Sequence, residues 1–194
     1  MNVGFDFDKV FIDYPPFIPY FLIDFLYKGR AVFRKSSKNF VPHYRIPGPF
    51  EQNVRILSHH PIFRHQISKN VDFLKAISSD KKIKKYLVSS RFSFLKNRTD
   101  GVLKKYQLKK YFDGIYFNYE NKQPHLFKEE TIKKLKIDTY IDDDIQLSVF
   151  LAQRNPRLTI FWVSDGRKTD IKLPKNVIKI NNLQEVKKHI KQHA

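Results

Sequence analysis

Six short apolar runs alternate along this chain with segments of helical pattern, and this alternation limits the fold more than any other feature. The runs occupy residues 3–7, 85–89, 114–118, 139–141, 158–163 and 177–180. The run around Trp162 is apolar without alternation, which is typical of parallel strands buried on both faces. We therefore predict an α/β fold, a doubly wound parallel sheet with helices on both faces and Trp162 in the core.

Helical periodicity is clearest in three segments between and after these runs. Apolar positions recur every three or four residues within 67–78, within 124–135 behind a proline, and within 183–190. Asn182, followed by Glu185 three residues later, has the pattern of a capping box at the start of the last helix. These helices provide the connections that a parallel sheet requires.

One connection is far too long for this scheme. About 75 residues separate the first two runs, where a βα connection normally needs only 2–6 residues plus a helix. This segment is rich in proline and aromatic residues. We predict a core domain of residues 1–12 and 66–194, with a cap inserted at 13–65. The apolar stretch 17–27 is too short to span a bilayer, so we expect a core or cap helix there.

Composition excludes several classes of protein. The chain of 194 residues has no cysteine, which rules out disulfide scaffolds, thiolate metal sites and cysteine nucleophiles. With no signal peptide pattern and no transmembrane segment, we expect a cytoplasmic protein. The net charge of +18 makes a basic partner improbable. A lysine-rich composition explains this charge as well as polyanion binding does, so a nucleic-acid partner is not favoured. The sequence leaves the oligomeric state open.

Polar residues follow the predicted strands where parallel sheets bind ligands, at the carboxyl ends. Asp6 and Asp8 close the first strand, and a carboxylate pair can attack phosphorus and transfer protons. Ser89, Ser90 and Arg91 follow the second strand and offer donors to an anion.

Two further features complete this edge. Lys122 precedes a helix and can neutralise charge at the site, with Lys128 as a competitor for the role. Asp142, Asp143 and Asp144 follow the fourth strand, and three successive carboxylates repel one another unless a cation lies among them. Oxygen ligands favour a hard cation, Mg²⁺ before Ca²⁺.

The joint pattern resembles the haloacid dehalogenase superfamily of phosphohydrolases over about residues 2–163. Its specific elements are the pair Asp6 and Asp8 and the pair Asp142 and Asp143. The resemblance implies a Mg²⁺-dependent phosphomonoesterase that acts through a covalent aspartyl-phosphate. A small phosphorylated metabolite or nucleotide is the expected substrate.

The resemblance also implies a role for each residue of the pattern. Asp6 corresponds to the nucleophile and Asp8 to the general acid and base. Ser89 corresponds to the residue that holds a phosphoryl oxygen, and Lys122 to the lysine that offsets charge, with Ser90 and Arg91 beside the substrate. The implied metal ligands are Asp6, Asp8 through its backbone carbonyl, Asp142 and Asp143.

One position departs from the family pattern. Many members carry glycine where Lys9 follows the second aspartate. The presence of Asp8 favours a phosphatase over the dehalogenase and phosphonatase branches, which lack that acid.

The inserted cap leaves alternatives open. Residues 28–45 carry six cations and no acid, and residues 81–110 are also basic. Such surfaces suit a phosphatase for nucleic-acid ends or phospholipid head groups, or a non-catalytic polyanion-binding module. His59, His60 and His65 lie on a loop without nearby acids, so we expect structural or solvent roles for them rather than a metal site.

Overall fold

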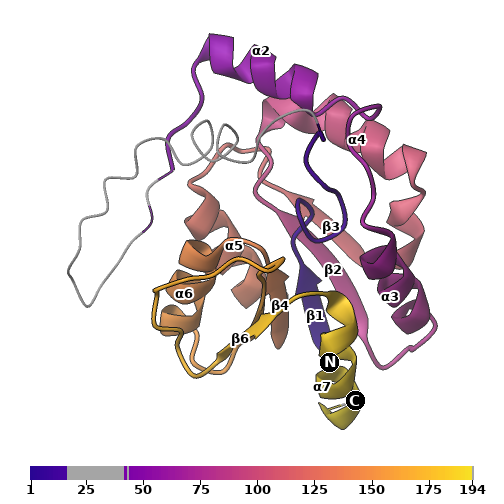
Figure 1. The fold of residues 1–194 in the computed structure, drawn as a ribbon, viewed down its shortest axis with the longest axis vertical. Helices are drawn as coiled ribbons and strands as arrows, with labels where there is room; N and C mark the ends of the chain where they lie inside the picture. Colours follow the sequence, from indigo (N-terminus) through magenta and orange to yellow (C-terminus); the bar gives the residue numbers. More distant parts are fainter. Residues whose placement is uncertain (17–41, 43, 194) are drawn as a thin grey trace.

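A single all-parallel sheet of six strands organises the molecule (Figure 1). The computed structural model describes residues 1–16, 42 and 44–193. The strand order is β3-β2-β1-β4-β5-β6. The strands are β1 (Asn2–Phe5), β2 (Lys84–Ser89), β3 (Gly114–Phe117), β4 (Thr139–Asp142), β5 (Thr159–Val163) and β6 (Val177–Ile180).

Helices cover both faces of the sheet, as predicted (Figure 1). Alternate residues of β5 point to opposite sides: Phe161 packs in the core with α3 and α7, and Ile160 and Trp162 pack in the core with α6. The helices are α2 (Pro49–Ser58), α3 (Ser68–Ser78), α4 (Lys96–Lys105), α5 (Pro124–Lys134), α6 (Ile145–Arg154) and α7 (Val186–His193). Short 3₁₀ turns are η1 (Ser93–Leu95), η2 (Leu108–Tyr111) and η3 (Leu183–Glu185).

The six predicted strands and the helices predicted within 67–78, 124–135 and 183–190 are present, with small shifts at their ends. Trp162 is buried, and Asn182 and Glu185 form the expected capping box at η3. The largest shift is at β1, which ends at Phe5, so that Asp6 and Phe7 lie beyond the strand. The cause is a tight turn in which the amide groups of Phe11 and Ile12 both donate to the carbonyl oxygen of Phe7.

Lys9 occupies the position in this turn where glycine is common in the resembling family. Its φ of 59° is left-handed, a conformation that costs a residue with a Cβ about 1–2 kcal/mol. Its amide donates to the carbonyl oxygen of Ile12, and its Nζ lies 2.7 Å from Asp13 Oδ1. These contacts hold a conformation that lysine alone would not prefer.

The inserted segment contributes α2, which lies beyond one end of the sheet and beside η1 (Figure 1). The apolar stretch 17–27 and all of the basic run 28–45 except residues 42, 44 and 45 lie outside the described residues. Within the part of the chain that is described, no helix is both long and apolar enough to cross a membrane.

Candidate active site

Three carboxylates meet at the carboxyl edge of the two central strands. Asp6 follows β1, Asp142 is the last residue of β4, and Asp143 comes next. Their ligand oxygens all lie within 4.8 Å of one another. The amide of Asp6 donates to the carbonyl oxygen of Ile141 at 2.8 Å, which carries the β1–β4 pairing one residue past β1 and fixes Asp6 in place.

Lys128, not Lys122, joins this carboxylate cluster. Its Nζ lies 2.7 Å from Asp142 Oδ2 and 3.3 Å from Asp6 Oδ1. The side chain of Lys122 is 42% exposed and pairs with Glu120 and Glu130 instead. Helix geometry explains the difference: Lys128 is one turn into α5 on its buried face, whereas Lys122 precedes the helix and turns outward. The geometry therefore favours Lys128 over Lys122 for the charge-neutralising role.

The carboxylates of this cluster repel one another, and a bound cation would relieve the repulsion. Burial, together with the charges of Asp142 and Asp8, raises the pKa of Asp6 to about 7 against the opposing charge of Lys128. Burial and the neighbouring Asp142 and Asp6 raise the pKa of Asp143 well above its usual range. Burial opposes the charge of Lys128, but Asp142 and Asp6 outweigh it and hold the pKa of Lys128 well above normal. Lys128 thus balances two buried acids, and Arg167, whose Nη2 lies 3.6 Å from Asp143 Oδ2, is the cation nearest the third among the described residues.

Asp144, the third aspartate of the run, has a structural role. Asp144 caps α6, since its Oδ1 accepts from the amides of Gln146 and Leu147 at 2.9 and 3.2 Å. Its Oδ2 accepts from the hydroxyl of Tyr44 at 3.0 Å. Asp144 therefore ties the inserted segment to the loop that carries Asp142 and Asp143.

Asp8 lies in the opposite environment, between two arginines. Its Oδ2 accepts from Arg91 Nε at 2.8 Å, and its Oδ1 accepts from Arg91 Nη2 at 2.7 Å and also from Arg64. The side chains of Arg64 and Arg91 are only 1% and 3% exposed. Burial alone would raise the pKa of Asp8, but Arg91 and Arg64 outweigh it and hold that pKa well below its usual range.

Arg91 is itself fixed from two further sides. Its Nη1 donates to Thr99 Oγ1 at 3.1 Å, and its guanidinium lies 4.5 Å from the centre of the Phe7 ring. Arg64 comes from the loop after α2, and Tyr106 donates to its carbonyl oxygen. Arg64 is not among the site residues expected from the sequence, because no local pattern distinguishes it from the chain's many other cations.

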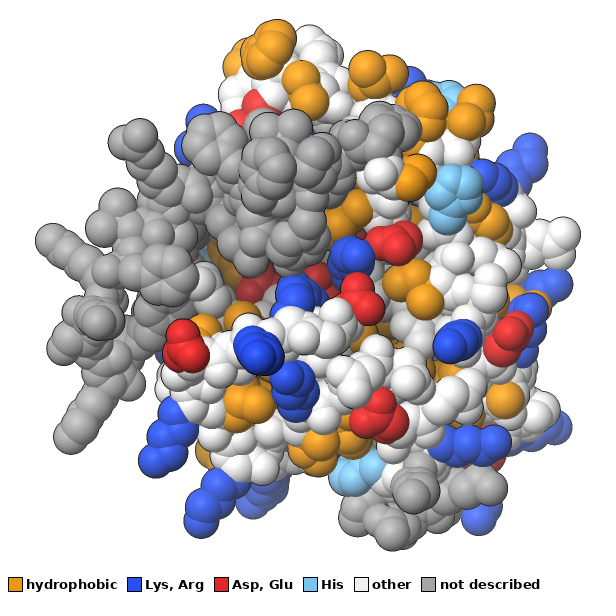
Figure 2. All heavy atoms as spheres, viewed as in Figure 1, with side chains coloured by type: hydrophobic (Ala, Val, Ile, Leu, Met, Phe, Trp, Pro, Cys, Tyr) orange, Lys and Arg blue, Asp and Glu red, His pale blue; other side chains and the backbone are white. Residues whose placement is uncertain are grey.

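A cavity of about 170 Å³ joins these groups. Figure 2 shows acidic and basic side chains close together near the middle of this face of the molecule. Ser89, Ser90 and Arg91 all line the cavity, as does Lys128. The hydroxyl of Ser90 is buried and has no hydrogen-bond partner among the residues that the structure describes. A buried donor without a partner at a cavity wall is what a ligand would satisfy.

The donor set fits a hard divalent cation. Three carboxylates from Asp6, Asp142 and Asp143 offer oxygen ligands at one point. Within the described part of the chain, Asp6 Oδ1 has no hydrogen-bond partner, although Lys128 Nζ lies 3.3 Å away. The Asp8 carboxylate is held by the arginines and does not join this ligand group, so only its backbone carbonyl remains for the role that the resemblance implies.

Among the described residues, the group that could hold a metal ion consists of carboxylates and includes no histidine. His59 is buried, and its Nδ1 lies 2.7 Å from the carbonyl oxygen of Arg55, with which it shares a hydrogen bond. Burial and the charges of Arg64 and Arg91 keep the pKa of His59 well below its usual value. His65 is exposed.

Comparison with known proteins points to one fold. No family model matches the chain, and no curated protein matches it in sequence. It is similar in structure to a haloacid dehalogenase-like hydrolase from Xanthomonas campestris, with a TM-score of 0.62 and 11% identity over 98% of this chain and 94% of that one. An L-2-haloacid dehalogenase gives a TM-score of 0.60 and 9% identity over 97% of both chains.

A third similar structure contains ligands. It is a haloacid dehalogenase family enzyme of Bacteroides thetaiotaomicron, a variant in complex with magnesium and inorganic phosphate. The TM-score is 0.53 and the identity 16%, over 87% of this chain and 96% of that one. At these identities the likeness establishes the fold, and the resemblance expected from the sequence is confirmed at that level: the chain has the fold of the haloacid dehalogenase superfamily of hydrolases.

Proposed function

We propose that the protein is a Mg²⁺-dependent phosphomonoesterase that acts through an aspartyl-phosphate. The observation that carries this proposal is the convergence of Asp6, Asp142, Asp143 and Lys128 beside Ser89 on one cavity. An aspartate nucleophile can attack a phosphate only when the repulsion between the two anions is removed. This group of residues supplies both the nucleophile and the means to neutralise it.

In the first step, an oxygen of Asp6 forms a bond to phosphorus while the bond from phosphorus to the leaving oxygen breaks. Lys128 balances the charge of Asp6 from 3.3 Å and keeps its own proton, since neighbouring acids raise its pKa. Ser89 and the partnerless Ser90 hydroxyl lie on the cavity wall, where they are available as donors to the substrate's oxygens.

In the second step, a water molecule attacks the phosphorus of the aspartyl-phosphate and restores the Asp6 carboxylate. Asp8 is the base that takes the water's proton, and the two guanidiniums favour its ionised, accepting form. The resemblance also implies that Asp8 donates a proton to the leaving oxygen in the first step, a role that its carboxylate cannot fill while the two guanidiniums hold it ionised.

Mg²⁺ held by Asp6, Asp143 and the backbone carbonyl of Asp8, with Asp142 in direct or indirect contact, would supply positive charge where the nucleophile meets the phosphoryl group. Asp142 already accepts from Lys128, which favours Asp143 as the direct ligand. Arg167 Nη2 donates to the carbonyl oxygen of Asp143 and steadies that loop.

The size of the cavity favours a small substrate. A volume of about 170 Å³ suits a phosphoryl group with a short leaving group better than a nucleic-acid end. A dehalogenase has the same fold, but the dehalogenase reaction would not require Asp8, so the presence of Asp8 between two arginines favours the phosphatase.

The test is hydrolysis of p-nitrophenyl phosphate with and without Mg²⁺. We expect metal-dependent turnover in the wild type and its loss, by at least about 1,000-fold, in Asp6→Asn. Asp143→Asn should require much more Mg²⁺ for the same rate, and Mg²⁺ should raise its melting temperature less than that of the wild type.

A matched control is Asp113→Asn, which removes an acid far from the cavity residues and should leave turnover unchanged. Full activity of Asp6→Asn would refute the covalent mechanism. Release of chloride from 2-chloropropionate, without phosphatase activity, would assign the dehalogenase reaction instead.

A further inference from the structure

Helix α2 buries its charged face and exposes its apolar one. Glu51, Arg55 and His59 lie one turn apart and are 7%, 5% and 1% exposed. Phe50 and Leu57, on the other side, are 83% and 65% exposed. A surface helix normally does the reverse, because burying apolar groups is what stabilises it. This orientation places the side chains of Arg55 and His59 at the wall of the cavity.

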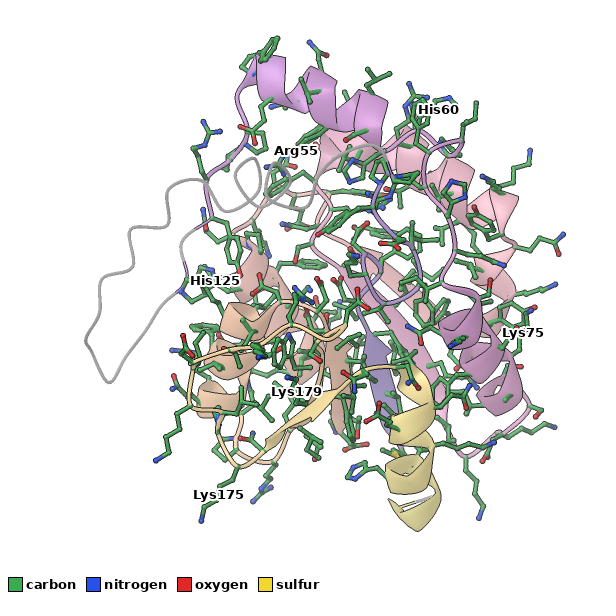
Figure 3. The ribbon with its side chains drawn as sticks, in the orientation of Figure 1. Arg55, His60, Lys75, His125, Lys175 and Lys179 are labelled. Carbon is green, nitrogen blue, oxygen red and sulfur yellow. The ribbon has the colours of Figure 1, made fainter. Side chains whose placement is uncertain are left out.

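Arg55 lies at the wall of the cavity that faces the sheet. Figure 3 shows it on the side of α2 toward the body of the molecule. Arg55 and Arg45 both line the cavity, together with His59. The acids among the described lining residues come from the end of β4 and from the segments after β1 and β4: Asp6, Asp8, Asp142, Asp143 and Asp144. Lys128, Arg91 and Arg167 line the cavity with them, and Arg55 and Arg45 are the lining cations that the inserted segment supplies.

Glu51 holds the Arg55 guanidinium in one orientation. Its Oε1 accepts from Arg55 Nε at 3.1 Å and from Arg55 Nη2 at 2.6 Å, and its Oε2 accepts from Arg45. One carboxylate thus orients two guanidiniums. A guanidinium whose direction is fixed in advance loses little freedom when it binds an anion, and Glu51 uses Nε and one N–H of Nη2 out of the five N–H donors of Arg55.

We propose that Arg55, with Arg45 at its side, is a second anion subsite that binds a carboxylate on the leaving group of the substrate. This inference rests on the proposed function, in which the phosphoryl group lies at the acidic end beside Lys128. The substrate class is then a small phosphorylated hydroxy acid, with its phosphate at the strand ends and its carboxylate at α2. Arg55 determines specificity and takes no part in bond making.

The experiment measures binding, so that it does not depend on turnover. Asp6→Asn protein is titrated in the presence of Mg²⁺ with 3-phosphoglycerate and with glycerol 3-phosphate, which differ only in a carboxylate against a hydroxymethyl group. We expect the first to bind about tenfold or more tightly, the usual effect of a charge-assisted hydrogen bond at a buried site. Adding Arg55→Gln should reduce this ratio to about one.

The matched control is Arg98→Gln in the same background. Arg98 also contacts α2, through a hydrogen bond from its Nε to the carbonyl oxygen of Ile56, but it does not line the cavity. It should keep the wild-type ratio, which separates loss of the guanidinium from disturbance of the helix.

Three results would overturn the subsite: equal affinity for the two compounds, a ratio that survives Arg55→Gln, or no binding of either compound. The proposed function is decided separately, by aryl phosphate hydrolysis in the wild type. Turnover with a ratio of one refutes the subsite alone, and a tenfold ratio without turnover refutes the phosphatase alone.

Discussion

Asp6 and Asp8 are two residues apart, yet their surroundings have opposite electrostatic character. Asp6 lies beside Asp142 and Asp143, where Lys128 is shared by Asp6 and Asp142 and Arg167 lies 3.6 Å from Asp143. Asp8 alone receives two buried guanidiniums. Burial and like charges raise the pKa of Asp6, whereas the arginines lower that of Asp8. Carboxyl groups separated in this way can take different chemical roles at one site.

The cause is the turn at Lys9. Because the chain reverses directly after β1, Asp6 stays at the strand edge beside β4 while Asp8 turns toward the loops that carry Arg64 and Arg91. The core elements supply the acids of the first environment. The second depends on the inserted segment, which supplies Arg64.

The largest expected effect comes from removing Lys128, the cation beside Asp6. Lys128→Met leaves Asp6 and Asp142 without their shared cation, and we expect a loss of turnover of about 100-fold or more. The measurement is aryl phosphate hydrolysis at saturating Mg²⁺. Lys122→Met removes the neighbouring lysine, whose partners are Glu120 and Glu130, and should leave the rate unchanged. Equal losses in the two variants would contradict the assignment.

The second prediction concerns the surroundings of Asp8. Asp8→Asn leaves two buried guanidiniums without a carboxylate, and we expect the free energy of unfolding to fall by about 3 kcal/mol. Urea unfolding measures it. Asp72→Asn is the control, since its pair with Lys75 is exposed and is worth less than about 1 kcal/mol. If Asp8→Asn lowers the free energy of unfolding no more than this control does, the buried arginines do not need the Asp8 carboxylate for stability.

The pH dependence of stability sharpens the difference. The pKa of Asp6 is about 7 in the folded protein, against an ordinary value of 3.8 for an aspartate in water. The folded state therefore binds the proton of Asp6 more tightly than the unfolded state does. The stabilisation from this protonated carboxyl is fully present below pH 4 and is lost as pH rises through 7. Without metal, we expect a loss of about 2 kcal/mol from this group between pH 5 and 8.

The measurement compares wild type with Asp6→Asn in EDTA by urea unfolding. His59, whose pKa is lowered, has the opposite slope near pH 6.5, but it is present in both proteins and cancels in the difference. The wild type should lose more stability than the variant as pH rises. Parallel curves would mean that Asp6 does not titrate in this range.

The smallest expected effect lies at the turn between the two aspartates. Lys9→Gly relieves the left-handed strain, whereas Lys9→Ala keeps it, and both remove the ion pair with Asp13. We expect the glycine variant to be more stable than the alanine variant by about 1 kcal/mol. Thermal unfolding distinguishes them, and a more stable alanine variant would show that the turn carries no strain.

Much of the fold and part of the candidate site can be predicted from the sequence. The unbroken apolar run at Trp162 and the periodic helices have local causes, since burial on two faces and helical spacing are properties of neighbouring residues. The same holds for the aspartates that follow the strands. Parallel topology then brings the ends of β1 and β4 together, so Asp6 and Asp142 can be expected to meet.

Other features depend on contacts between residues far apart in sequence. Lys122 and Lys128 are equally plausible in the sequence, and only the direction of α5 decides between them. Arg64 is 56 residues from Asp8, and Arg55 faces the cavity although its helix has an apolar side to bury. The sequence alone determined which residue types stand at the strand ends, because that is local. The tertiary structure decided which cations reach them, because a charge acts through distance and burial, and both are set by packing.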